Sequence, residues 1–161
     1  MLAPFVDALV SRGRRALSSG DHAKAAKDFK QALTYPENLQ AGRPGDAGTE
    51  PMVRYWLAQA KKAAGDHTGC RRELENALKG WINPGEMNYW RARALSELGR
   101  TGEIAEHIQG LKTAIETLER PAPKVIDAYA KFGGENTPME RAAKNAKKAA
   151  NLRKMLSEIE K

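Results

Sequence analysis

The stretch that decides the fold is residues 54–78, whose sequence is RYWLAQAKKAAGDHTGCRRELENAL. Helical patterns on both sides of Gly65-Asp66 predict a helix, a tight turn and a second helix, because glycine suits the left-handed turn position and aspartate caps the next helix. The Tyr55-Trp56 pair recurs 34 residues later as Tyr89-Trp90, and Gly65 recurs as Gly99 at the same spacing. Matches at one fixed period indicate an internal repeat whose unit is a helical hairpin.

The composition favours helices throughout the chain. Alanine, leucine, lysine, arginine and glutamate dominate its 161 residues, and no run shows the alternation of a half-buried strand. This length is typical of one domain with its own apolar core. We therefore predict a single all-α domain, residues 1–161, in which helix-turn-helix units stack as a repeat solenoid.

The repeat units can be placed from their turn glycines. The Gly20-Asp21 turn precedes Gly65-Asp66 by 45 residues, so this connection holds an insertion. Residues 37–51 are rich in glycine and proline, which predicts a loop that is either an extended spacer or a ligand-facing segment. Gly133 lies 34 residues after Gly99 and suggests a degenerate fourth unit. The predicted units are three hairpins at about 4–35, 52–79 and 86–118, followed by a degenerate hairpin or capping helix at 122–161.

The C-terminal helix has a clear start signal. In Thr137-Pro138-Met139-Glu140, threonine can cap the helix, proline suits its first turn, and glutamate lies three positions after the cap. The basic side chains that follow, Lys144 and Lys147 among them, fit the polar outer surface that a terminal repeat needs. The alternative is a surface for an acidic partner or a nucleic acid.

The hairpins resemble tetratricopeptide repeats, a family of 34-residue helix-turn-helix units with large and small residues at fixed places. The third unit keeps Ala92 and Gly99 and then departs from the pattern. The resemblance implies a non-catalytic interaction module that binds a protein partner, either a peptide or a neighbouring domain, in a concave groove lined by the first helix of each unit. The matching residues are Gly13, Gly20, Ala25, Phe29 and Ala32 in the first unit, and Leu57, Ala58, Gly65, Cys70, Leu74 and Ala77 in the second.

The same resemblance implies a set of groove residues. Arginine can bind a carboxylate through two parallel hydrogen bonds and tyrosine supplies rigid contact area, so the partner could be an acidic peptide. The alternative is that Tyr55 and Tyr89 pack between helices. We expect Trp56 and Trp90 in the core, because their large area is best buried. Trp81 lies in the turn at residues 80–85, and we expect it to pack as the apolar anchor of that turn. The candidate partner-binding residues are Arg14, Tyr55, Gln59, Lys62, Tyr89, Arg93 and Ser96.

Two other functions remain open at this point. The segments Tyr35–Leu39 and Ala41–Pro44 look similar to the C-terminal repeat segment of large bacterial proteins with a domain of unknown function and carbohydrate-active-like modules. That likeness implies an accessory region of a carbohydrate-active bacterial enzyme. The net charge of +7 permits a basic helical binder of nucleic acid.

Catalysis, cofactors and metals are not expected. His22 and His67 both follow Gly-Asp and are interpreted as turn residues, His107 stands alone, and Cys70 is the only cysteine. No phosphate loop, nucleophile elbow or metal-binding motif occurs. No apolar run approaches the length of a membrane span, and the N-terminus lacks the pattern of a secretory signal, so we predict a cytoplasmic chain that does not enter the membrane.

Overall fold

The computed structural model describes residues 3–34, 48–121 and 138–161, and within these ranges every regular element is helical. This confirms the predicted all-α class for the described part of the chain. In order, the elements are α1 (Ala3–Ser18), α2 (His22–Leu33), α3 (Glu50–Ala63), α4 (His67–Ala77), α5 (Glu86–Glu97), the short 3-10 helix η2 (Thr101–Glu103), α6 (Ile104–Glu119) and α8 (Pro138–Ile159).

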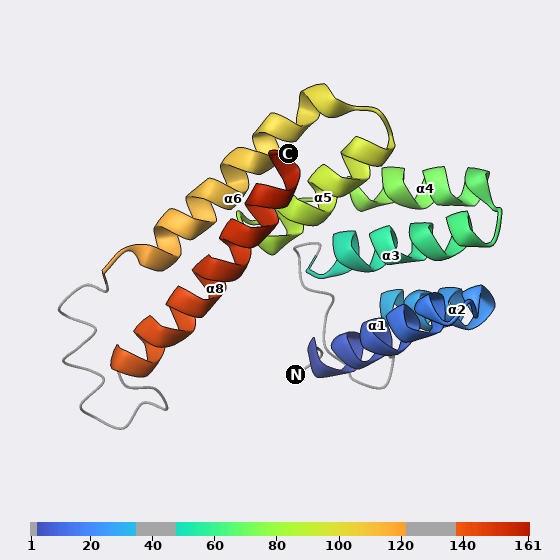
Figure 1. The fold of residues 1–161 in the computed structure, drawn as a ribbon, viewed down its shortest axis with the longest axis horizontal. Helices are drawn as coiled ribbons and strands as arrows, with labels where there is room; N and C mark the ends of the chain where they lie inside the picture. Colours follow the sequence, from blue (N-terminus) through green and yellow to red (C-terminus); the bar gives the residue numbers. More distant parts are fainter. Residues whose placement is uncertain (1–2, 35–47, 122–137) are drawn as a thin grey trace.

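The helices pack as three consecutive hairpins, α1 with α2, α3 with α4, and α5 with α6. Each hairpin contacts the next, because α3 packs on α2 and α5 packs on both α3 and α4 (Figure 1). The C-terminal helix α8 packs on α6 and α5. It runs antiparallel to α6, since Arg153 pairs with Glu119 at the end of α6 while Glu160 pairs with the earlier Lys112.

The turns that matched in sequence have one backbone geometry. Gly20, Gly65 and Gly99 have φ angles of 83°, 81° and 73°, the left-handed region that glycine enters without the steric cost of a Cβ atom. The side chains of Asp21 and Asp66 then accept hydrogen bonds of 3.0 Å and 2.8 Å from backbone N–H groups in the first turn of the next helix. In the third turn no side chain caps the next helix, and η2 precedes α6.

Replacing the cap is expected to weaken the second hairpin. We predict that Asp66→Ala lowers the free energy of unfolding by about 1 kcal/mol, because the N–H of Gly69 loses its acceptor. Asp66→Asn is the matched control and is expected to retain most of the stability, since asparagine caps about as well as aspartate. Urea unfolding measures both, and an equal loss in the two variants would show that the cap is not the cause.

Two groups of buried side chains form the core, and α3 joins them. The first lies among α1, α2 and α3 around Phe29, and the second among α3, α4, α5, α6 and α8 around Leu111. Met52 and Trp56 of α3 pack against both. Gly13 lets α1 approach α2 closely, because a Cβ atom at this position would lie 2.7 Å from Cε1 of Phe29.

Some expectations need correction and others fall outside the described residues. Helix α3 begins at Glu50, so the last two residues of the predicted 37–51 loop are helical, with Pro51 in the first turn where no backbone N–H is needed. The prediction that Trp81 packs as an anchor is wrong, because its side chain is 61% exposed, whereas the neighbouring Ile82 is partly buried. The remainder of the loop and residues 122–137 of the predicted fourth unit lie outside the described residues.

Candidate partner-binding site

Four aromatic rings join α3 to α5. The two residues of each Tyr-Trp pair are consecutive on a helix, so their side chains leave it in neighbouring directions. Trp90 lies at the centre, with ring centroids 5.4 Å from Tyr55, 5.6 Å from Trp56 and 5.0 Å from Tyr89. Edge-to-face and tilted contacts of this kind stabilise an interface beyond the burial of the rings. The repeated dipeptide therefore fixes how the second hairpin sits on the third.

Arg93 links the hydroxyl groups of the two tyrosines. It lies four residues after Tyr89 and hence on the same face of α5. Its Nη1 donates a 2.8 Å hydrogen bond to the hydroxyl oxygen of Tyr89, and its Nη2 donates a 2.8 Å hydrogen bond to that of Tyr55. One guanidinium group thus spans two helices.

Glu97 terminates this network on one side. Its Oε1 accepts hydrogen bonds from the hydroxyl of Tyr55 at 3.0 Å and from Nε2 of Gln59 at 2.7 Å, and its Oε2 accepts one from Nζ of Lys62 at 2.9 Å. Burial alone would raise the pKa of Glu97, but these hydrogen bonds, led by that of Lys62, outweigh it and hold the pKa below its ordinary value. Glu97 is therefore charged at neutral pH.

Glu158 of α8 terminates the network on the other side. Its Oε2 accepts a 2.6 Å hydrogen bond from the hydroxyl of Tyr89. Burial, reinforced by this bond, raises the pKa of Tyr89, and burial raises the pKa of Tyr55 to about 12, so both phenols are protonated donors at neutral pH. The network holds two cations, Arg93 and Lys62, and two carboxylates, so its formal charge is zero.

The structure brings together five of the seven predicted residues, namely Tyr55, Gln59, Lys62, Tyr89 and Arg93. Arg14 lies beside them, with its guanidinium carbon 4.6 Å from the centroid of the Trp56 ring. Ser96 is exposed on α5. The set predicted from the sequence contains neither Glu97 nor Glu158. Glu97 could have been predicted, because it continues the four-residue spacing of Tyr89 and Arg93 along α5. Glu158 could not, because it lies 69 positions from Tyr89 and no local spacing relates the two.

Burial divides the aromatic residues differently from the expectation. Tyr55 is only 2% exposed and Tyr89 is also buried, as in the alternative that both pack between helices. Trp90 is buried as expected, whereas Trp56 is partly exposed and its indole N–H has no hydrogen-bond partner in the described part of the chain. Both rings lie against Trp90, but Tyr55 is buried in the core group of the second and third hairpins, whereas Trp56 lies beside Arg14 where α1 and α3 meet.

Comparison of the chain with protein-family models, with curated proteins and with solved structures gave no match. The site is therefore interpreted from its own geometry. Among residues 3–34, 48–121 and 138–161, no three His, Cys, Asp or Glu side chains are grouped so that they could hold a metal ion. Every helix in those ranges is too short or too polar to cross a lipid bilayer.

The acid stability of the chain is expected to depend on Glu97. Its folded-state pKa lies below the ordinary value of 4.5, so its contribution to stability is complete above that pH and is lost as the pH falls through the folded-state pKa. We predict that Glu97→Gln unfolds more easily at neutral pH and loses less stability than the wild type on acidification. Urea unfolding between about pH 7 and about pH 3 measures this. Glu116→Gln, at an exposed position of α6, is the control. An unchanged pH profile in Glu97→Gln would contradict the assignment.

Proposed function

We propose that the chain is a non-catalytic interaction module that binds a segment of a partner protein. In this proposal the three hairpins are copies of one tetratricopeptide-like unit, α8 covers the last of them, and the partner lies across the first helices, α1, α3 and α5. Support comes from the shared geometry of the three turns and from the close contact between Gly13 and Phe29, the small and large residues of the first unit. The exposed side chains of the predicted set, rather than its buried tyrosines, make the contact.

The observation that carries the proposal is the position of Arg14. Its guanidinium carbon lies over the Trp56 ring, 4.6 Å from the centroid, and this cation–π contact orients an otherwise flexible side chain. Arg14 is exposed and, among the described residues, its guanidinium makes no hydrogen bond or ion pair. An arginine held by stacking with free N–H donors is suited to a carboxylate, which it can bind through two parallel hydrogen bonds.

The partner chemistry follows from Arg14 and its neighbours. An acidic side chain of the partner would bind Arg14, and an adjacent apolar or aromatic side chain would cover the exposed part of Trp56. The network around Arg93 does not add net charge, and its cations are already bonded. It contributes rigidity, because it fixes α3, α5 and α8 relative to one another and so reduces the ordering cost of binding.

Two neighbouring arginines of α1 provide the test. We predict that Arg14→Ala weakens the binding of the partner about tenfold, the usual cost of losing a charged hydrogen-bonded pair. Arg15→Ala removes the same charge from the next, exposed position and is expected to change affinity less than about twofold. The partner is first captured with the wild-type chain, identified by mass spectrometry and then titrated against each variant. Equal effects of the two substitutions would show that only net charge matters.

A second candidate function, the binding of nucleic acid, is favoured by one observation on α8. Lys144, Lys147 and Lys154 are exposed, and their ammonium groups have no ion-pair partner within the described ranges. Binding of a single-stranded RNA through them would weaken steeply with salt. Substituting the three with alanine should then reduce affinity and the salt slope, whereas substituting Lys24, Lys27 and Lys30 of α2 should not. Equal affinity of both triple variants and the wild type would remove this candidate.

A further inference from the structure

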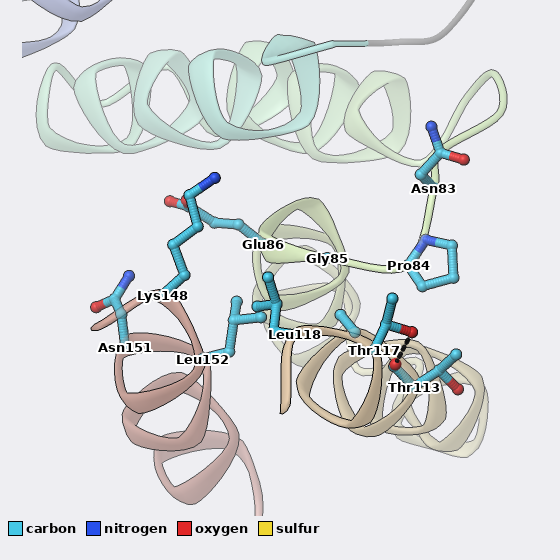
Figure 2. A pocket seen from close by; sticks show the side chains of 11 residues that line it. Asn83, Pro84, Gly85, Glu86, Thr113, Thr117, Leu118, Lys148, Asn151 and Leu152 are labelled. Carbon is cyan, nitrogen blue, oxygen red and sulfur yellow. Dashed lines mark hydrogen bonds between the residues drawn. The ribbon is translucent and has the colours of Figure 1, made fainter. Parts of the chain in front are cut away.

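A cavity of about 500 Å³ opens where the N-terminal end of α5 meets α6 and α8 (Figure 2). Leu118 of α6, Leu152 of α8 and Pro84 of the preceding loop give it an apolar lining. Leu152 is buried in the core, so this part of the lining is held in place by the fold. The volume falls within the range of roughly 300–1,000 Å³ that is usual for ligand sites.

Two asparagines stand on opposite sides of the apolar lining. Asn83 belongs to the loop before α5, and Asn151 belongs to α8 (Figure 2). Neither side-chain amide makes a hydrogen bond to any residue that the structure describes. An asparagine amide offers both donors and an acceptor, which is the complement of a peptide unit with its own N–H and C=O groups.

The charges at the cavity argue for a ligand without net charge. Glu86 and Lys148 both line it, and Figure 2 shows their side chains extending toward the same side of the opening. Their formal charges cancel. A ligand carrying a single carboxylate or ammonium group would gain from one of them and be repelled by the other. A neutral ligand with hydrogen-bonding groups meets no such opposition.

We propose that this cavity binds an extended, uncharged segment of a partner polypeptide. One aliphatic side chain of that segment lies against Leu118 and Leu152, and the peptide units on either side of it bond to Asn83 and Asn151. A polypeptide is the occupant that supplies an apolar group flanked by amides on both sides. The cavity shares no residue with the predicted set on α1, α3 and α5. Binding at the cavity can therefore be tested independently of the function proposed above.

Short capped peptides test the proposal on the full chain. The probe is acetyl-Ala-Leu-Ala-amide, titrated while the side-chain amide signals of Asn83 and Asn151 are followed by NMR. We expect both signals to shift, and acetyl-Ala-Gly-Ala-amide to bind at least about tenfold more weakly because it lacks the aliphatic side chain. Asn151→Ala and Asn83→Ala should each weaken the leucine peptide about fivefold. Arg14→Ala should leave its affinity unchanged.

Isocaproate, which carries the same aliphatic group on a carboxylate, separates a peptide site from an anion site. We expect it to bind more weakly than the leucine peptide. Tighter binding of isocaproate, equal binding of the leucine and glycine peptides, or no shift of the two asparagine signals would each overturn the proposal. Because both asparagines are exposed, their alanine variants are expected to fold, and the remainder of the amide spectrum verifies this.

Discussion

Phe29→Ala is expected to lower the free energy of unfolding by about 3–5 kcal/mol. Phe29 is 0% exposed and is the centre of the core group that joins the first hairpin to α3. Its ring also fills the space left by Gly13, so truncation leaves a cavity that the closely packed backbones of α1 and α2 cannot easily collapse. The side chain of Phe29 makes no hydrogen bond, so the loss of stability in Phe29→Ala measures packing alone.

Phe5→Ala is the matched control for this prediction. Phe5 lies on α1 but is 40% exposed, and the same substitution there should cost less than about 1 kcal/mol. Urea unfolding followed by circular dichroism compares the two variants under one set of conditions. Similar losses for both would mean that α1 and α2 do not pack through Phe29.

Arg91→Ala is expected to cost about 3 kcal/mol, because charged hydrogen bonds inside the protein are lost together. Arg91 is 6% exposed. Its Nε donates to the backbone carbonyl of Ala77 at 3.1 Å, and its Nη2 donates to those of Lys79 and Gly80 at 2.6 Å and 3.0 Å. The carbonyl of Ala77 belongs to the last residue of α4 and the other two follow it, at the end of the helix where backbone acceptors are left unsatisfied. Arg91 thus holds the start of the α4–α5 loop against α5.

The control for Arg91 is an arginine whose contacts are exposed. Arg153→Ala breaks a surface ion pair in which the side chain of Arg153 is 60% exposed and that of Glu119 is 38% exposed. It should lower the free energy of unfolding by less than about 1 kcal/mol. Arg91→Lys is expected to recover only part of the loss, because one ammonium group cannot reproduce the spread of the guanidinium donors. Full stability of Arg91→Lys in urea unfolding would contradict the role assigned to the three carbonyl contacts.

Much of the fold could be predicted because it depends on local signals. The Gly-Asp turns act through backbone conformation and capping within a few residues, so the positions of Gly20 and Gly65 located the first two hairpins. The sequence predicts the start of α3 two residues late, because Pro51 fits a loop rich in glycine and proline as well as the first turn of a helix. The prediction for Trp81 is wrong because hydrophobicity alone does not say which residue of a turn faces the core.

The site was predictable where helix geometry determines neighbours. Tyr89 and Arg93 are four residues apart and therefore share a face, and the 34-residue period places Tyr55 opposite them. Which member of the Tyr55-Trp56 pair is buried depends on the rotation of α3, and both residues are aromatic, so periodicity does not decide it. The hydrogen bond between Tyr89 and Glu158 depends on where α8 packs, and no local sequence pattern predicts that position.

The most direct test of the account is site-specific photo-crosslinking in the cells that produce the chain. A benzoylphenylalanine at Ser96, exposed on α5, is compared with one at Gln31, exposed on α2 and so on a second helix of a hairpin. If the chain is an interaction module that binds through α1, α3 and α5, the probe at Ser96 will crosslink to a defined partner segment containing acidic residues. The probe at Gln31 will not, and the crosslink at Ser96 will be weaker in Arg14→Ala. Equal crosslinking from both positions, or crosslinking from Gln31 alone, would contradict the assignment of the partner to the first helices.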